Sequence, residues 1–299
     1  MVFTMDKIAI ALTKDASMRI YAAVTTNTVA EAARLHKTSA VAAAALGRTL
    51  TAAAMMGAML KNDNGSLTMQ IKGDGPLGMV VAVAEADGTV RGYASNPQAQ
   101  FPPRANGKLN VAGAVGKNGF INILRDNAGS DFFKGPYSGT VPLVSGEIAE
   151  DLTAYYAISE QIPTSVGLGV SVGADSAVLA SGGFIAQVMP GFGYDDEKNI
   201  SAVESALKEI PSISELISGG CCAEKLAETV LGGIEHNILE TRPVHYRCNC
   251  NIDRVERALL SIGKADLQEL IDSGEDSHVN CHFCDKEYTV TAKRLAGLR

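Results

Sequence analysis

Residues 40–61, AVAAAALGRTLTAAAMMGAMLK, decide how the first two thirds of this chain fold. Ser39 can cap a helix that starts at Ala40, because its side-chain oxygen can accept a hydrogen bond from the first turn, and the polar run 62–65 ends the pattern. Apolar and small residues occupy nearly every side of this helix, and a helix without a polar face is normally buried. We therefore expect it at the centre of a domain, with sheets packed closely against its alanines and glycines.

The composition of this stretch argues against a membrane span. A spanning helix needs about 20 leucine-class residues without a central charge, whereas this one is rich in alanine and carries Arg48 in its middle. The first ten residues show no basic region followed by a long apolar run, so no secretion signal is evident. We therefore expect a cytoplasmic protein without a membrane partner.

Strand patterns lie on both sides of the helix in the sequence. Alternating or β-branched residues predict strands over residues 8–12, 18–24, 67–71, 79–83, 89–94, 120–124, 140–144, 166–172, 177–180 and 184–189. Asp87-Gly88 predicts a hairpin turn and Asn118-Gly119 predicts another, while Thr28 and Glu31 fit a capping box that opens a short helix. Residues 1–193 are thus predicted to form one α+β domain, with antiparallel sheet around the buried alanine-rich helix.

Residues 194–243 have a different character. Three sets of apolar residues recur at helical spacing. Pro211 and Gly219-Gly220 separate them, and Gly232-Gly233 follows the last set. Each predicted helix is near or below the length of roughly 12 to 15 residues at which an isolated helix becomes marginally stable in water. We expect an amphipathic helical linker that needs a surface to lie on and can leave that surface at low cost.

Residues 244–299 carry four cysteines in two close pairs, Cys248 with Cys250 and Cys281 with Cys284. A C-x-x-C turn and an extended C-x-C segment can each place two sulfurs about 3.8 Å apart, the separation around a tetrahedral zinc ion with Zn–S bonds of about 2.3 Å. We predict a zinc site in a small domain with two helices after the first pair and a hairpin around the second. Asp253 and Glu256 resemble a capping box that opens the first of these helices. So small a domain has little core and should depend on the metal for folding.

Oxidation of such a site has a direct structural consequence. Thiolates can be oxidised to sulfenic acid and on to a disulfide, which ejects the metal. Zinc contributes on the order of 10 kcal/mol or more in small zinc peptides, which exceeds the stability of many whole domains. The site therefore has the physical properties of a switch, and a purely structural zinc ribbon is the alternative.

Other side chains offer further candidates. His245, His278 and His282 lie near the cysteine pairs and could replace a thiolate, although four cysteines already complete a zinc shell. Cys221-Cys222 is a vicinal pair in the linker, either two ordinary thiols at a helix start or a modulating redox pair. Ser159-Glu160 has no histidine partner and no nucleophile elbow, so we find no catalytic constellation.

The charge distribution argues against nucleic acid as a partner. The part from Arg242 onward has nine basic and nine acidic residues, so the net charge of −7 comes entirely from the rest of the chain. No basic patch appears, and such a patch is what the phosphate backbone requires. A nucleic-acid-binding zinc protein and an enzyme with a structural zinc ribbon are therefore the weaker alternatives to a binding protein with a thiol switch.

The chain closely resembles the 33 kDa chaperonin family, the redox-regulated heat-shock holdases of bacteria. The resemblance rests on the C-x-C and C-x-x-C pairs within residues 247–250 and 279–284, and on RVERALL at 254–260. Upstream it includes ALGRTL at 45–50, Ser95-Asn96-Pro97, Tyr155-Tyr156, Ser159-Glu160-Gln161, Gly182-Gly183-Phe184 and Met189-Pro190-Gly191. It therefore spans essentially the whole chain.

The resemblance implies an ATP-independent cytoplasmic chaperone rather than an enzyme, with one zinc ion per chain at the four cysteines in an inactive reduced form. It implies that oxidation links Cys248 with Cys250 and Cys281 with Cys284. Zinc then leaves, the tail and linker unfold, and apolar surface captures unfolding client proteins. Activated members form homodimers. Cys221-Cys222 is not part of the four-cysteine pattern of the family, which leaves additional or mixed disulfides open.

Overall fold

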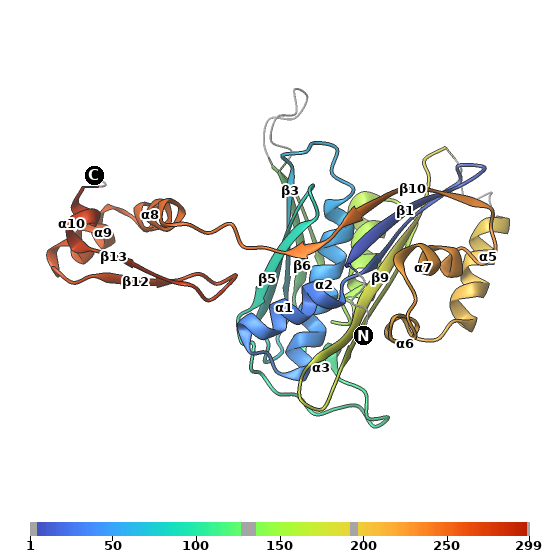
Figure 1. Ribbon diagram of the computed structural model, residues 1–299, viewed down its shortest axis with the longest axis horizontal. Helices are drawn as coiled ribbons and strands as arrows, with labels where there is room; N and C mark the ends of the chain where they lie inside the picture. Colours follow the sequence, from blue (N-terminus) through green and yellow to red (C-terminus); the bar gives the residue numbers. More distant parts are fainter. Residues whose placement is uncertain (1–4, 127–135, 192–196, 298–299) are drawn as a thin grey trace. The chain divides into compact units, whose positions relative to one another are not determined.

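Helix α2 (Ala40–Gly57) lies between the two main sheets, as its sequence predicts (Figure 1). The Ser39 side chain caps it by accepting a hydrogen bond from the backbone N–H of Ala42 at 3.2 Å, and the helix ends before the predicted limit near Lys61. All of its residues except the first and Arg48 are buried. Within the described part of the chain, α2 alone is long and apolar enough to cross a membrane, and 89% of that window is buried inside the protein.

The computed structural model describes residues 5–126, 136–191 and 197–297, which form two compact units, Met1–Tyr246 and Arg247–Arg299. The predicted boundary between the core domain and the linker, at residues 193 and 194, lies outside the described residues.

The first unit contains two sheets, in which every strand pair is antiparallel except β11–β5. One has the order β10-β1-β2-β9-β8 and the other the order β11-β5-β4-β3-β6-β7. The strands of the five-stranded sheet are β1 (Lys7–Thr13), β2 (Met18–Val24), β8 (Thr164–Val172), β9 (Val178–Val188) and β10 (His236–Pro243). Those of the six-stranded sheet are β3 (Ser66–Lys72), β4 (Met79–Glu85), β5 (Thr89–Ala94), β6 (Phe120–Asp126), β7 (Tyr137–Pro142) and β11 (His245–Tyr246).

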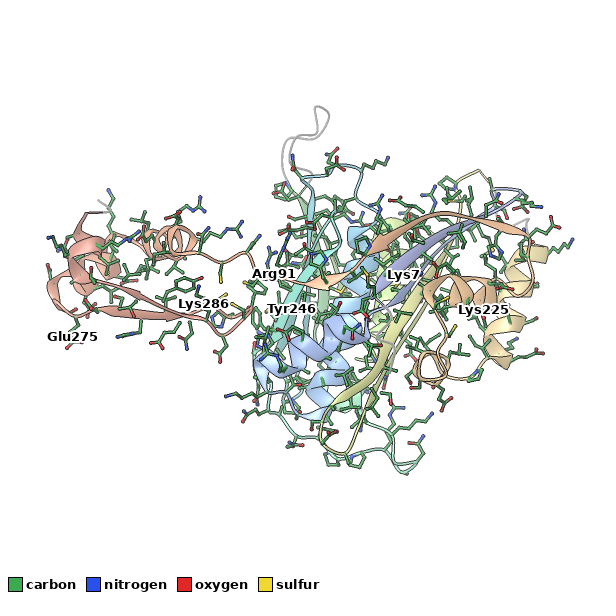
Figure 2. All side chains as sticks on the ribbon, in the orientation of Figure 1. Lys7, Arg91, Lys225, Tyr246, Glu275 and Lys286 are labelled. Carbon is green, nitrogen blue, oxygen red and sulfur yellow. The ribbon has the colours of Figure 1, made fainter. Side chains whose placement is uncertain are left out.

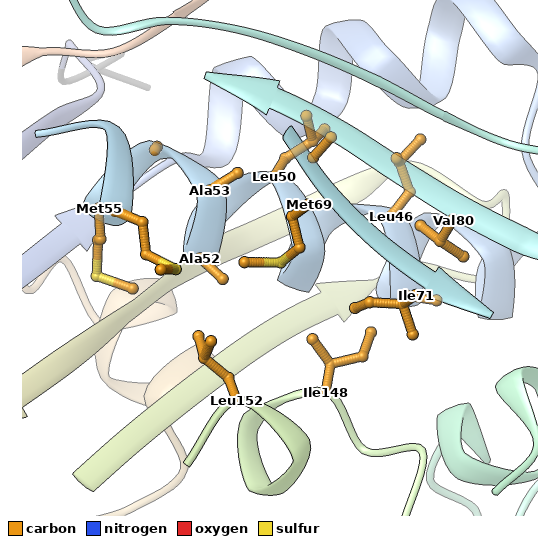
Figure 3. Packing of buried hydrophobic residues seen from close by; sticks show 14 of the residues in the cluster. Leu46, Leu50, Ala52, Ala53, Met55, Met69, Ile71, Val80, Ile148 and Leu152 are labelled. Carbon is orange, nitrogen blue, oxygen red and sulfur yellow. The ribbon is translucent and has the colours of Figure 1, made fainter. Parts of the chain in front are cut away.

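The main core lies around α2. Leu46 and Leu50 of the helix pack in one cluster with Met69 and Ile71 of β3 and with Leu152 of a short helix (Figure 3). Burial of each such side chain is worth about 1.5–3 kcal/mol. The smaller helices of this unit outside the linker are α1 (Thr26–His36), α3 (Val111–Val115), α4 (Ala149–Tyr155) and the π-helical turn η1 (Tyr156–Glu160).

The inner strands of the five-stranded sheet, β1, β2 and β9, are buried on both faces. Successive side chains of a strand point to opposite faces, so Ile8 and Ile10 of β1 join the cluster around α2, whereas Ala9 and Ala11 join a second cluster. That second cluster contains the apolar residues of three helices, α5 (Glu197–Glu209), α6 (Ile213–Ser218) and α7 (Ala223–Val230). The three predicted linker helices thus form, with α6 and α7 on the outer face of this sheet and α5 beside α7 (Figure 1).

Four local predictions are wrong in detail. Helix α1 begins at Thr26 rather than at Thr28, because the carboxylate of Asp6 accepts hydrogen bonds from the backbone N–H groups of Asn27 and Thr28. Asn118-Gly119 does not close a hairpin, since α3 rather than a strand precedes β6. The two strands predicted over 177–180 and 184–189 form one strand, β9, and β10 was not predicted at all.

The second unit is small. Its elements are α8 (Ile252–Leu260), α9 (Lys264–Asp272), β12 (Ser277–Asn280), β13 (Glu287–Val290) and α10 (Ala292–Ala296). The two predicted helices and the predicted hairpin are present. The buried apolar residues that we can describe in this unit are Val255, Leu259, Leu267, Tyr288, Val290 and Leu295. This core is far smaller than that of the first unit, so other interactions must contribute to its stability.

Candidate metal centre

The four predicted cysteine ligands come together in the second unit. Their sulfurs all lie within 4.8 Å of one another, and each cysteine is half-buried. The Sγ atoms of Cys248 and Cys281 are 3.6 Å apart, and those of Cys250 and Cys284 are 3.5 Å apart. Sulfurs around a tetrahedral zinc ion are separated by about 3.8 Å, so this arrangement fits the metal.

The first cysteine pair belongs to an extended segment that leads into α8. The side chain of Asn251 caps this helix by accepting a hydrogen bond from the backbone N–H of Arg254 at 2.9 Å. The sequence predicted a cap at Asp253, two residues later. Because Asn251 follows Cys250 directly, the cap holds the end of the C-x-C segment against the start of the helix.

The second cysteine pair occupies the turn between β12 and β13. The carbonyl of Cys281 accepts hydrogen bonds from the backbone N–H groups of Cys284 at 3.3 Å and Asp285 at 2.8 Å. The backbone N–H of Cys281 donates to the carbonyl of Lys286 at 2.9 Å, which closes the turn. Asp285 has a φ of 58°, a left-handed conformation that short polar side chains tolerate. The backbone therefore presents both sulfurs of the C-x-x-C pair from a tightly bonded turn.

Tyr288 adds a polar contact that the sequence did not predict. Its hydroxyl donates a hydrogen bond to the sulfur of Cys250 at 3.1 Å, and Lys286 Nζ lies 4.9 Å from the centre of the Tyr288 ring (Figure 2). Tyr288 stands four residues after Cys284 on β13, and its meeting with Cys250 depends on how the two halves of the unit pack. Spacing in the sequence gives no signal for such a contact.

The surroundings of the sulfurs make their acidities unequal. Burial opposes ionisation of Cys250, but hydrogen bonds from Tyr288 and the other thiols outweigh burial and lower the pKa of Cys250 to about 7. Burial and the neighbouring thiols raise the pKa of Cys284 to about 11 and also raise the pKa of Cys248. One thiolate thus forms readily, and further negative charge in the cluster needs a cation to offset it.

The histidines near the cysteines do not join this group. Within the described residues, the cluster that could hold a metal consists of the four cysteines alone. His278 Nδ1 lies 3.0 Å from a carboxylate oxygen of Glu287, and His245 Nε2 lies 3.1 Å from the hydroxyl of Thr89. The vicinal pair Cys221-Cys222 lies in the first unit, at the start of α7.

Comparisons with known proteins agree with this architecture. Residues 6–291 match the family model described as Hsp33 protein. The 33 kDa chaperonin of Clostridium botulinum strain 657 is 47% identical over 293 residues, covering 98% of this chain and 97% of the relative. The 33 kDa chaperonin of Geobacillus sp. strain WCH70 is 44% identical over 294 residues, with the same coverage of both chains.

A solved structure shares the fold as well. The crystal structure of the 33 kDa chaperonin (heat shock protein 33 homolog) of Thermotoga maritima matches 99% of this chain and 98% of its own, with a TM-score of 0.86 and 34% sequence identity. Family model, relatives and structure each cover nearly the full length of the chain. This chain therefore belongs to the Hsp33 family.

Proposed function

We propose that this chain is a redox-regulated, ATP-independent chaperone that holds unfolding proteins under oxidative and heat stress. The observation that carries the proposal is the gathering of four cysteine sulfurs within 4.8 Å in a unit whose described core has six buried apolar residues. A unit of this kind is stable only while its sulfurs share a metal. The name of the relatives, 33 kDa chaperonin, supports chaperone activity.

In the reduced state one zinc ion per chain would be held by Cys248, Cys250, Cys281 and Cys284. A bound structural zinc ion supplies folding free energy, on the order of 10 kcal/mol in small zinc peptides. The hydroxyl of Tyr288 stabilises the Cys250 thiolate through its hydrogen bond. The linker helices meanwhile cover the outer face of the five-stranded sheet, so the reduced chain offers clients little apolar surface.

Oxidation removes the ligands of the site. Peroxide oxidises one thiolate of a pair to a sulfenic acid and is itself reduced to water, and the second thiol then displaces the hydroxyl as another water to form the disulfide. We propose the pairs Cys248–Cys250 and Cys281–Cys284. A disulfide offers no thiolate to a metal, so residues 247–299 lose their main source of stability and unfold.

We propose that the chain works as three parts: a chaperone core over 1–193, an amphipathic linker over 194–243 and a zinc-binding redox switch over 244–299. Release of the linker exposes the small apolar residues of the sheet together with the apolar sides of α6 and α7. These surfaces bind unfolding clients in the cytoplasm, and activated chains form homodimers. Neither nucleic acid nor a membrane is a partner in this proposal.

The test combines three measurements on the full zinc-loaded chain. Peroxide is added at mild heat, and zinc release is followed with a chromophoric chelator while light scattering reports the aggregation of a thermally unfolding client. Peptide mass analysis then maps the disulfides. We expect zinc release, pairing of near-neighbour cysteines and suppressed scattering to rise together.

A quadruple variant with serine at all four cysteines is the control. Lacking the metal site, it should suppress scattering to the same extent with and without peroxide. Zinc that stays bound under peroxide, or scattering that is unchanged after zinc release, would refute the switch. Activity that still requires peroxide in the quadruple variant would show that other groups carry the response.

A further inference from the structure

The pair Cys221-Cys222 joins α6 to α7 on the outer face of the five-stranded sheet. Cys221 packs against the apolar cluster that the sheet and the linker helices share, and Cys222 is the N-cap residue of α7. Both side chains are half-buried. The Sγ of Cys221 lies 3.6 Å from the carbonyl oxygen of Cys222, its own neighbour, rather than in the metal centre.

The backbone of the pair holds both helix ends. The N–H of Cys221 donates to the carbonyl of Leu216 at 3.1 Å and so ends α6, while the carbonyl of Cys222 accepts from the N–H of Leu226 at 2.9 Å and so begins α7. In the first turn of α7, Glu224 forms an ion pair with Lys7 of β1 (Figure 2). A change in the conformation of this one dipeptide therefore disturbs two helices and their attachment to the sheet.

A disulfide between adjacent cysteines would strain this backbone. Neighbouring Cα atoms across a trans peptide are about 3.8 Å apart, whereas bridged cysteines usually have Cα atoms about 4.4–6.8 Å apart. Closing the small ring requires the peptide unit and the flanking dihedrals to rearrange. That rearrangement would shift the groups on either side of the ring that bond to Leu216 and Leu226, and so would weaken the ends of both helices.

We propose that Cys221-Cys222 is a second dithiol, which oxidises to a vicinal disulfide once α6 and α7 have left the sheet and then opposes their return. The proposal rests on the proposed function, because release of the linker is part of that function. Two thiols and one molecule of peroxide yield one disulfide and two waters, with peroxide as the two-electron oxidant. If the docked helices disfavour the disulfide, the disulfide disfavours docking by the same factor.

Packing of α6 and α7 on the sheet protects Cys221 and Cys222 from oxidation. Burial, followed by the neighbouring Cys222, raises the pKa of the Cys221 thiol, so this sulfur is a poor nucleophile while it packs against the sheet. Release removes that burial. The pair should therefore respond later than the four cysteines of the metal centre and report on the released linker.

The experiment uses the peptide of residues 209–225, which trypsin produces by cleavage after Lys208 and Lys225 and which contains Cys221 and Cys222 but no other cysteine. Unpaired thiols are alkylated before digestion. In the reduced zinc-loaded chain we expect both thiols to be alkylated. In the activated chain we expect the peptide to carry no alkyl group and to be two mass units lighter than the same peptide with two free thiols. Moderate urea with peroxide tests the pair even if peroxide alone does not activate the chain.

Two single variants, Cys221→Ala and Cys222→Ala, separate the disulfide from packing effects, since either one prevents the ring. Both should release zinc like the parent chain. When the oxidised chains, whose metal-centre cysteines stay paired, are returned from moderate urea to buffer without a thiol reductant, α6 and α7 of both variants should recover several-fold more amide protection than α6 and α7 of the parent chain. Alkylation of the pair in chains whose four metal-centre cysteines are oxidised would overturn the proposal and leave the proposed function intact. Disulfide formation in helices that keep full amide protection would also overturn it. Unequal recovery of the two variants would assign the effect to packing.

Discussion

Tyr288 and Cys250 illustrate how much depends on single contacts in the small unit. The hydroxyl of Tyr288 points at the sulfur with the lowered pKa, and the ring of Tyr288 is one of the buried residues of the unit. One side chain therefore contributes to the apolar core and to the sulfur cluster at once. Hydrogen bonds of this kind orient metal ligands, and removing them typically costs 10- to 100-fold in metal affinity.

The variant Tyr288→Phe should keep the core contact and lose the hydrogen bond. We expect zinc affinity to fall by about tenfold, because the thiolate of Cys250 loses its donor. The same change leaves the sulfur more electron-rich, so peroxide should release zinc faster. Competition with a chromophoric chelator measures the first effect, and stopped-flow zinc release measures the second.

Tyr137→Phe is the matched control, because the Tyr137 hydroxyl lies on β7 of the first unit, 3.4 Å from Ser159. It should change neither the zinc affinity nor the rate at which peroxide releases zinc. Equal affinities for Tyr288→Phe and the parent chain would mean that the contact does not support the metal centre.

Gly47 is a second position where a single added atom, a Cβ, should change the stability of the protein. A Cβ atom placed there would lie 2.6 Å from Cγ1 of Val29 on α1 and 3.0 Å from Cγ2 of Val170 on β8. Alanine improves helix propensity over glycine by about 1 kcal/mol, but overpacking a core costs about 1–3 kcal/mol. Both valines are β-branched and therefore stiff, so the steric cost should win.

We expect Gly47→Ala to lower the free energy of unfolding of the first unit by about 1–2 kcal/mol, measured by urea denaturation. Gly219→Ala serves as the control, since the nearest atom that its Cβ would meet is 3.3 Å away and its φ is −74°. A stabilised Gly47→Ala chain would show that α1 and β8 can move away from α2 without cost.

At the scale of elements, the sequence predicts best where burial is repeated along a segment. Helix α2 is predicted because nearly every side is apolar, and β1 and β2 because strand-like apolar runs flank the polar turn 14–17; all three elements are mostly buried. Strand β10 lies at the edge of its sheet, with most of its residues exposed, and it pairs with β1 more than 200 residues earlier in the chain. Neither the exposed pattern nor so distant a partner leaves a signal in the local sequence.

The parts of the metal centre also differ in how well the sequence predicts them. Two of the four cysteines lie on a hairpin that alternation and the C-x-x-C turn predict, so their geometry could be anticipated. Two helix caps, unlike that of Ser39 on α2, could not be anticipated, since Asp6 caps α1 from a residue that precedes β1, and Asn251 caps α8 in place of the predicted Asp253. A cap is chosen by side chains that tertiary structure brings near, and several polar residues compete for each helix start.

A polar contact attaches α5 to the first unit in addition to the apolar packing of Val203. Asn199 Nδ2 donates to a carboxylate oxygen of Asp15 at 2.7 Å and to the hydroxyl of Ser17 at 2.8 Å, which ties the helix to the turn between β1 and β2. Hydrogen bonds from Thr13, Ser17 and Asn199 hold the pKa of Asp15 well below its usual range. Their stabilising contribution is therefore present above about pH 4 and is lost as the pH falls below the unfolded-state value.

Asn199→Asp should loosen α5 near neutral pH, because a second carboxylate would face Asp15. Loss of hydrogen bonds to a charged group costs about 1.5–3 kcal/mol, and the repulsion adds to this. Lys14 and Lys198 line the same shallow pocket, but Lys14 already pairs with Glu235 at 2.9 Å, so Lys198 is the lysine of the pocket that remains to offset part of the new charge. We expect faster amide exchange in α5 and faster activation by peroxide at pH 7.

The pH dependence distinguishes repulsion from the lost hydrogen bonds. Near pH 4 to 5 one of the two carboxyls takes up a proton and can donate to the other, so Asn199→Asp should regain part of the lost protection. Asn199→Ala loses the hydrogen bonds without adding charge, and its defect should be the same from pH 4 to 8. If both variants behave alike across this range, repulsion plays no part.

At the scale of the whole molecule, the two units differ in what stabilises them. The first buries α2 between two sheets and buries the inner strands of the five-stranded sheet on both faces, so its core is large. The second has a described core of six apolar residues and one cluster of four thiols. A domain typically has only 5–15 kcal/mol of net stability, which is comparable to what one structural zinc ion supplies. Loss of the metal should therefore unfold one unit and spare the other.

Chelation of zinc under reducing conditions tests this without any oxidant. We expect amides over residues 247–299 to exchange at rates close to those of an unfolded chain, while β1, β2 and α2 keep their protection, measured by hydrogen exchange and mass spectrometry. The variant with serine at the four cysteines should exchange in this way with or without chelator, because it has no site to lose. Restoring zinc should return protection to the parent chain alone. Protected amides in α8 and α9 after complete zinc removal would mean that the six-residue core suffices, and the metal centre could then not act as the stabilising element of the switch.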